Sequence, residues 1–97
     1  MIIALVGYGR MGHEIESIAT ARGHVVRLVI DKDNTQELNS TNLAGIDAAF
    51  EFTSPSSAFF NIVTCLENKV PVVSGSTGWL EKYDQAVDAC IKNNTAF

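Results

Sequence analysis

Short apolar runs alternate with amphipathic segments along the first third of the chain. The runs Ile2 to Val6 and Val25 to Ile30 are nearly continuous in apolar residues, as strands covered on both faces are. Between them, Arg10 to Ala21 has helical periodicity and is followed by Gly23, which suits a helix C-terminus. The apolar stripe of this helix comprises Met11, Ile15, Ile18 and Ala19. The pattern therefore predicts a strand, a helix and a second strand.

The alternation of apolar runs and amphipathic segments is interrupted after Ile30 and resumes at Asp47. Residues 31–46 are polar without a sustained apolar period, so they have room for a helical turn or two rather than a full crossover helix. A third strand is expected at Asp47 to Phe52. Ser54 is expected to cap a helix that has Pro55 at its first position and ends near Asn68.

The last third repeats the alternation. A short fourth strand is expected at Pro71 to Ser74, and a helix is expected from about Trp79 to Asn93. Residues 95–97 look like the start of a fifth strand. This order predicts an α/β fold, a Rossmann-like doubly wound parallel sheet in three layers with a reduced second crossover. Residues 1–97 are expected to be one domain, and the last strand suggests that the chain is cut from a longer one.

Composition narrows the class of protein. A hydrophobic fraction of 46% excludes a disordered chain, and no apolar run approaches the ~18 residues that span a bilayer. The net charge of −4 without a Lys/Arg cluster argues against nucleic acid as a partner. Cys65 and Cys90 are expected to be reduced thiols on helices. We therefore expect a cytoplasmic protein with no membrane partner.

The segment from Gly7 to Gly12 (GYGRMG) closes the first strand and opens the first helix, and it matches GxGxxG. Gly7 would allow the tight turn, Gly9 the approach of a pyrophosphate, and Gly12 close helix–strand packing. Asp31 follows Gly12 by 19 positions, where an acid can bind the adenosine ribose. Together these features indicate a dinucleotide site. The alternative is a turn whose glycines only relieve steric strain.

Four small or polar segments directly follow strands, and ligands of parallel sheets lie beyond those carboxyl ends. They are Gly7–Gly12, Asp31-Lys32, Thr53-Ser54 and Gly75–Gly78. Asp31 favours NADH, whereas an ammonium group at Lys32 can pair with the 2′-phosphate of NADPH, so we expect NADH or NADPH as cofactor. Lys32 can equally be a solvated surface residue.

Other candidates carry weaker signals. Arg10 either reaches a phosphate or is a surface arginine. His13 is expected to be an exposed residue of the first helical turn, and Trp79 either covers a ligand or caps the core. No His, Cys and carboxylate residues have metal-ligand spacing, and no Ser/His/Asp constellation can be placed.

The segments GYGRMG, EFTSP and SGSTGW, in this order, resemble bacterial dihydrodipicolinate reductase, also called 4-hydroxy-tetrahydrodipicolinate reductase. That family has Gly-Arg-Met-Gly at the end of its glycine turn, as in residues 9–12. It has Asp-Phe-Thr or Asp-Phe-Ser before a proline and Gly-Thr-Thr-Gly before an aromatic residue. Here Glu51 stands for the usual Asp and Ser76 for a Thr, and the glycine loop is one residue shorter than in many members.

The resemblance implies an oxidoreductase of diaminopimelate and lysine biosynthesis that reduces a cyclic dicarboxylate with NADH or NADPH. It implies that Gly7 to Gly12 hold the pyrophosphate, Asp31 the adenosine ribose, and Thr53 the region of the second ribose. Gly75 to Thr77 would face the nicotinamide, with Thr77 also touching substrate. The implied cofactor-binding residues are Gly7, Tyr8, Gly9, Arg10, Met11, Gly12, Asp31, Lys32, Phe52, Thr53, Ser54, Gly75, Ser76 and Thr77.

The same resemblance places the His- and Lys-rich substrate motif, and the contacts of a homotetramer, in a second domain beyond Phe97. We therefore expect no catalytic residue in this chain, and cofactor binding without turnover. Two alternatives stay open at this point. One is an NAD-sensing regulatory domain, which gives no reason for EFTSP and SGSTGW. The other is the cofactor domain of another two-domain amino-acid dehydrogenase.

Overall fold

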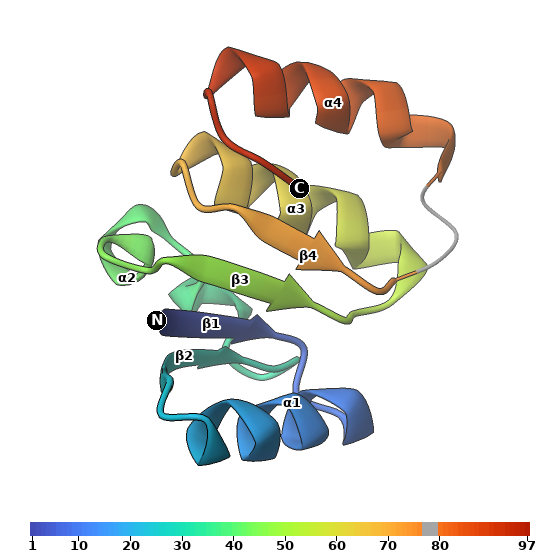
Figure 1. Cartoon of the computed structure of the whole chain (residues 1–97). Helices are drawn as coiled ribbons and strands as arrows, with labels where there is room; N and C mark the ends of the chain where they lie inside the picture. The colour runs from blue at the N-terminus through green and yellow to red at the C-terminus, as the bar shows by residue number, and fades with distance from the viewer. Residues whose placement is uncertain (77–79) are drawn as a thin grey trace.

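A single parallel sheet forms the middle layer of the computed structural model, which describes residues 1–76 and 80–97 (Figure 1). Its strand order is β2-β1-β3-β4, and all three neighbouring pairs are parallel. The strands are β1 (Ile2–Val6), β2 (Val25–Ile30), β3 (Ala48–Glu51) and β4 (Val72–Ser74). The α/β fold, with its doubly wound parallel sheet, is confirmed.

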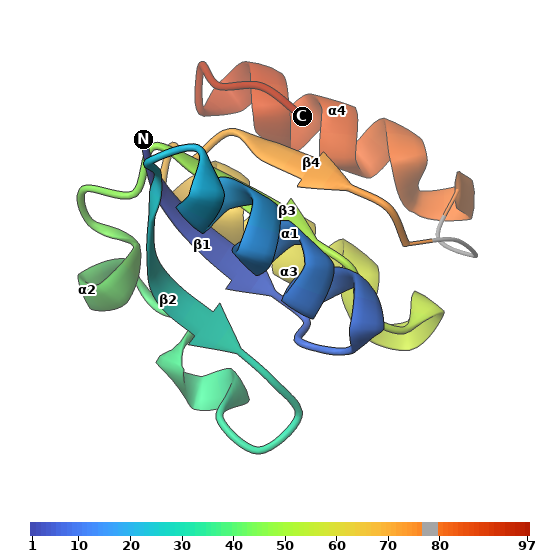
Figure 2. The same ribbon diagram turned by 60° about the horizontal axis from the view of Figure 1, so that its bottom comes forward.

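Helices cover the two faces of the sheet unequally. The α-helices are α1 (Arg10–Ala21), α2 (Ser40–Leu43), α3 (Pro55–Glu67) and α4 (Tyr83–Lys92), and short 3₁₀ turns are η1 (Thr35–Glu37) and η2 (Leu80–Lys82). Helix α1 lies on one face, over β1 and β2, whereas α3 and α4 lie on the other (Figures 1 and 2). This arrangement leaves the three layers that the alternation predicts.

The two cores follow from the alternation of side chains along β1. Ala4 and Val6 belong to the larger core under α3, whereas Ile3 and Leu5 pack with Ala19 of α1. The reduced crossover, which the sequence predicts, consists of η1 and α2. Although this segment is mostly polar, it buries three apolar side chains in the larger core: Leu38, Leu43 and Ile46.

Four details differ from the sequence-based expectations. On α1, Met11 and Ile18 are exposed, because only Ile15 and Ala19 reach the sheet. Ser54 occupies the N-cap position of α3, but its hydroxyl bonds with those of Ser56 and Ser57 rather than with a cap amide. The last α-helix begins at Tyr83 rather than near residue 79, and β3 and β4 are shorter than expected.

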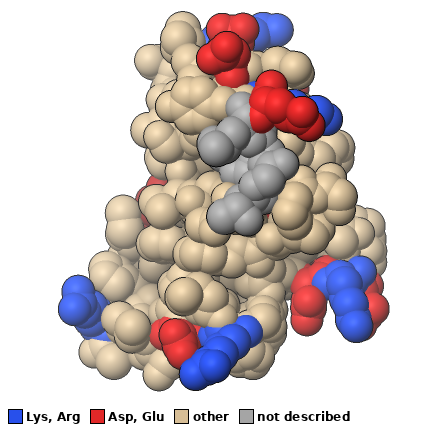
Figure 3. Space-filling model, turned by 90° about the vertical axis from the view of Figure 1, so that its right-hand side faces the viewer, with Lys and Arg blue, Asp and Glu red and all other residues tan. Residues whose placement is uncertain are grey.

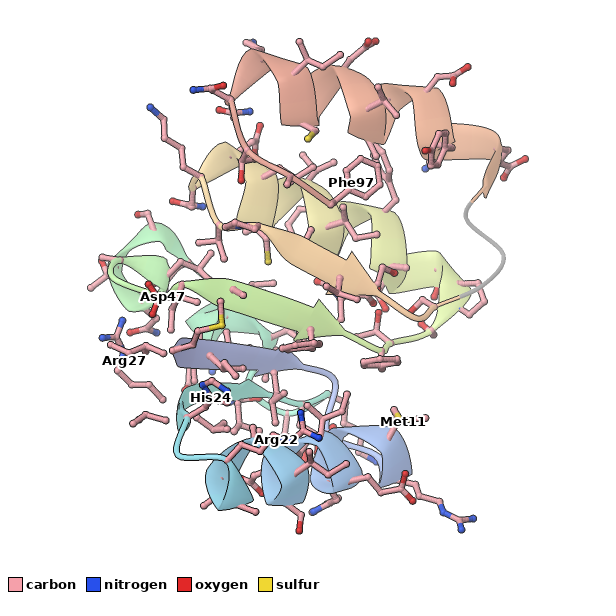
Figure 4. The ribbon with its side chains drawn as sticks, viewed as in Figure 1. Met11, Arg22, His24, Arg27, Asp47 and Phe97 are labelled. Carbon is pink, nitrogen blue, oxygen red and sulfur yellow. The ribbon has the colours of Figure 1, made fainter. Side chains whose placement is uncertain are left out.

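The expected fifth strand is not formed in residues 95–97. The Val72 N–H donates to the Ala96 carbonyl oxygen at 3.0 Å, so the segment runs beside β4 with this one hydrogen bond. Phe97 lies beneath α4, and its ring is tilted by 52° against that of Tyr83, with ring centroids 5.8 Å apart (Figure 4). In the described residues, no helix has both the length and the apolar character needed to cross a membrane.

Candidate functional site

The loops that follow the strands are tied to one another at the carboxyl edge of the sheet. The Gly7 N–H donates to the Ile30 carbonyl at 2.8 Å, and the Phe52 N–H donates to the Val6 carbonyl at the same distance. The Gly75 N–H donates to the Glu51 carbonyl at 2.9 Å. The loops therefore follow the strand order, and Figure 3 views this edge, where the charged side chains lie mainly toward the top and the bottom of the view.

Two of the three glycines of the first loop have a steric reason within the fold. A Cβ atom on Gly7 would lie 2.1 Å from the Phe52 carbonyl oxygen, and the φ angle of Gly7 is +108°. A Cβ atom on Gly12 would lie 2.6 Å from the Gly7 carbonyl oxygen, so the helix can approach the turn only at a glycine. Among residues 1–76 and 80–97, a Cβ atom on Gly9 would meet nothing within 4 Å. The fold thus explains Gly7 and Gly12 but not Gly9.

A cleft of about 380 Å³ opens beside Gly9. Its lining comes from the loops after β1, β2 and β3 and from the first turns of α3: Gly7, Tyr8, Gly9, Ile30, Asp31, Lys32, Thr35, Phe52, Thr53, Ser54, Ser57 and Asn61. The N-terminus of α1 begins at Gly9, and its first turn contains no acidic residue. A helix N-terminus of this kind favours an anionic group.

Asp31 is held by its own loop at the end of β2. The Lys32 N–H donates to Asp31 Oδ1 at 2.8 Å, and Asn34 Oδ1 accepts from the Asp31 N–H at 2.5 Å. Asn34 Nδ2 in turn donates to the Val29 carbonyl at 2.9 Å. One carboxylate oxygen of the exposed Asp31 thus has an intramolecular partner, and Asn34, which the sequence analysis missed, fixes the turn.

Tyr8 connects the glycine loop to α1. Its hydroxyl donates to Glu16 Oε1, and this hydrogen bond, together with the charge of Glu16, raises the pKa of Tyr8. The ring of Tyr8 lies against that of His13, with centroids 3.8 Å apart. His13 is exposed, as expected, and its ring makes a tilted contact with that of Tyr8.

A buried carboxylate joins the loops after β3 and β4. Glu51, the last residue of β3, has no exposed surface. Its Oε2 accepts from the Thr53 N–H at 3.0 Å, from the Thr53 hydroxyl and from Ser76 Oγ at 2.8 Å. Its Oε1 accepts from Ser74 Oγ at 2.6 Å. The sequence analysis missed this role, and the only signal was a charged residue inside an apolar strand.

The predicted residues divide between the cleft and its surroundings. Arg10 is 94% exposed and pairs with Glu14 at 3.6 Å, so in this structure its guanidinium does not line the cleft. Met11, Gly12, Gly75 and Ser76 also lie outside the lining, and Gly75 instead packs on the Phe52 ring. The predictions for Thr77 and Trp79 fall outside the described residues. Lining residues that the sequence analysis missed are Ile30, Thr35, Ser57 and Asn61.

His24 and the opposite edge of the sheet do not line this cleft. His24 Nδ1 lies 3.0 Å from the amino group of Met1, and Asp47 Oδ2 accepts from the Ile2 N–H at 2.7 Å. Figure 4 shows His24, Arg27 and Asp47 together at the amino ends of the strands, away from the cleft. The cleft-lining residues that carry polar groups therefore lie at the carboxyl edge, apart from these three.

Comparisons with known proteins agree with this geometry. The family model described as "Dihydrodipicolinate reductase, N-terminus" matches residues 1–97. A 4-hydroxy-tetrahydrodipicolinate reductase from Christiangramia forsetii is 46% identical over 97 residues, which are 100% of this chain and 40% of that protein. The reductase of the same name from Bifidobacterium longum subsp. infantis is 33% identical over 93 residues, 94% of this chain and 36% of that protein.

This chain thus spans about two fifths of the length of these relatives. From the family match and the identity, the chain belongs to the dihydrodipicolinate reductase family and corresponds to its N-terminal region.

Proposed function

We propose that residues 1–97 are a dinucleotide-binding domain that holds NADH or NADPH along the carboxyl edge of the sheet. The observation that carries the proposal is Gly9. Among the described residues, no contact requires a glycine there, yet the position faces a cleft at a helix N-terminus. A pyrophosphate that approaches the backbone closely is the ligand that needs a missing Cβ at this point.

The strand order gives the cofactor a direction. The loop after β2 carries Asp31, the loop after β1 carries Gly9, and the loop after β3 carries Thr53, in neighbouring positions across the sheet. Adjacent strands lie about 4.8 Å apart, so these loops can contact successive parts of one extended dinucleotide. We place the adenosine ribose at Asp31, the pyrophosphate at Gly9 and the second ribose near Thr53.

The choice between the two cofactors depends on the end of β2. Asp31 has one carboxylate oxygen without an intramolecular partner in the described residues, which suits the ribose hydroxyls of NADH. Lys32 and Thr35 line the same part of the cleft and suit the 2′-phosphate of NADPH. We propose that both cofactors bind, with NADH depending more strongly on Asp31.

In the whole protein, this domain would serve the reaction named for its relatives, reduction of 4-hydroxy-tetrahydrodipicolinate. When bound, the nicotinamide supplies the hydride. The residues of this chain bind and orient the cofactor, and the loops at Thr53 and Gly75 limit the access of water to its reactive end. The substrate contact of Thr77, the tetramer and the cytoplasmic location that the resemblance implies stay predictions.

Calorimetric titration of the chain with NADH and NADPH tests the proposal directly. We expect saturable binding of both cofactors, and no reductase turnover by residues 1–97 alone. Absence of binding to either cofactor by the folded chain would contradict the proposal. Turnover by the isolated chain would contradict the assignment of the substrate site to the remainder of the relatives' length.

A further inference from the structure

Glu51 is a buried acidic residue whose presence is not explained by binding of the adenosine half of the cofactor. It has no exposed surface, and in the part of the chain that the structure describes, its hydrogen-bond partners are neutral amide and hydroxyl donors. A buried carboxylate is costly unless it is well supplied with donors, and an apolar side chain of similar volume often stabilises a fold as well. The stability of the sheet therefore gives no evident reason for a carboxylate here.

What the carboxylate does is join two loops. The donors come from Thr53 on the loop after β3 and from Ser74 and Ser76 at the end of β4. A second set of contacts closes the same arrangement, because the Thr53 N–H also donates to Ser76 Oγ at 2.8 Å. Ser76 Oγ lies 2.9 Å from the Thr53 carbonyl oxygen as well. We call Glu51, Thr53, Ser74 and Ser76 the carboxylate clamp.

The clamp lies directly behind the wall of the cleft. Thr53 lines the cleft, whereas Glu51 and Ser74 do not. Asn61 of α3, another lining residue, donates from Nδ2 to Thr53 Oγ1 at 3.3 Å. On the other side, the Phe52 ring packs so closely on Gly75 that a Cβ there would lie 1.9 Å from a ring carbon. Through these contacts, Glu51 fixes the cleft wall formed by the loop after β3, which is the wall farthest from Asp31 in the strand order.

We propose that Glu51 is a positioning residue for the nicotinamide half of the cofactor. Its carboxylate holds the loops after β3 and β4 in the arrangement that receives this half, without touching the cofactor itself. The inference rests on the proposed function for the identity of the ligand. It adds that the two halves of the site have separate structural supports: Asp31 and the glycine loop for the adenosine half, and the carboxylate clamp for the nicotinamide half.

The substitution Glu51→Gln tests the clamp in the full-length gene product without cofactor. Glutamine keeps the volume but loses the charge and replaces one acceptor oxygen with an NH₂ donor. Since charge-assisted hydrogen bonds are roughly twice as strong as neutral ones, we expect hydrogen exchange of the Thr53 amide to accelerate about tenfold. Cys65→Ala is the control, because Cys65 is as fully buried as Glu51 but makes no clamp hydrogen bond in the described residues. Its Thr53 exchange should stay near that of the parent.

A comparison of two ligands separates positioning from general destabilisation. NADH contains the nicotinamide half, whereas ADP contains only the adenosine half and the pyrophosphate. Glu51→Gln should weaken NADH binding about tenfold in calorimetry, a loss of 1.4 kcal/mol, and change ADP binding by less than about twofold. Ser74→Ala, which removes the donor to Oε1 outside the cleft lining, should act in the same direction if Glu51→Gln fails to fold.

Three results would overturn the inference or its basis. Unchanged NADH affinity together with unchanged Thr53 exchange in Glu51→Gln would refute the clamp. Equal losses for NADH and ADP would make Glu51 a structural residue only. If the parent protein binds neither nucleotide, the proposed function fails instead. Faster exchange of the Thr53 amide in Glu51→Gln would then show that the clamp exists but serves another purpose, which refutes its link to NADH.

Discussion

The substitution Gly9→Ala separates ligand binding from folding, because no contact in the described part of the chain requires a glycine at this position. A Cβ atom there would meet none of the described residues within 4 Å, and the backbone of Gly9 is extended, with φ −84° and ψ −153°. The negative φ of Gly9 lies in the range that alanine adopts readily, unlike the positive φ of Gly7. The new methyl group would stand at the N-terminus of α1, beside the cleft where we place the pyrophosphate.

The expected change in stability is small, because two effects oppose each other. Alanine is a poorer N-cap than glycine by up to about 1 kcal/mol, whereas its smaller unfolded-state entropy favours folding by about 0.4–1 kcal/mol. The free energy of unfolding should therefore change by less than about 0.5 kcal/mol, which for a chain of this size moves Tm by no more than about 4 °C. NADH affinity should fall at least about tenfold, since the methyl group keeps the pyrophosphate from the helix amides.

Gly23→Ala provides the matched control for the assay by thermal unfolding and calorimetric titration. Gly23 has a φ of +84° at the end of α1, and a Cβ there also meets nothing within 4 Å. Here alanine is strained by about 1–2 kcal/mol, so Tm should fall while NADH affinity stays unchanged. The reasoning is refuted if Gly9→Ala binds NADH as the parent does, or if it loses as much stability as Gly23→Ala.

Three further predictions use other residues. Gly7→Ala should lower the free energy of unfolding, measured in urea, by more than about 2 kcal/mol. The new Cβ would lie 2.1 Å from the Phe52 carbonyl oxygen, and the φ angle at this position is positive. A loss below about 1 kcal/mol would contradict the turn geometry. Asp31→Ala should weaken NADH binding more than NADPH binding in calorimetry, and equal losses would remove Asp31 from the ribose site. Burial, with a smaller contribution from the charge of Glu51, raises the pKa of Cys65 from 9.0 to about 12. Above pH 9 the unfolded chain releases the Cys65 proton and the folded chain keeps it, so the free energy of unfolding should fall between pH 9 and 12. In urea titrations at each pH, Cys65→Ala should lose the part of this decline that comes from the thiol. An unchanged decline in the variant would contradict the raised pKa.

Local patterns in the sequence were sufficient to predict most of the fold. The bounds of β1, β2 and α1 agree with the expected ranges, because a continuous apolar run, a helical stripe and a terminal glycine are all local signals. The exposure of Ile18 was not predictable in this way. It depends on how much of α1 the sheet covers, and periodicity contains no information on that.

The site was predictable where its residues follow strands and not where contacts cross between loops. Gly9, Asp31 and Thr53 line one cleft, as the rule for parallel sheets indicates. The clamp residue Glu51 and the turn residue Asn34 act through side-chain hydrogen bonds to residues whose positions only the folded chain defines. The sequence gives only a weak indication that Asn61 lines the cleft: it lies one helical turn after Ser57 and therefore on the same face of α3.

The central claim is that one dinucleotide lies along the carboxyl edge of this sheet. Its most direct test is a titration of isotopically labelled chain with NADH, followed by amide chemical shifts in nuclear magnetic resonance. The account predicts that the largest shifts occur at Gly9, Asp31 and Thr53, while His24 and Asp47 at the opposite edge stay unchanged. Saturating NADH that shifts none of the first three amides, or that acts mainly at the opposite edge, would contradict the account.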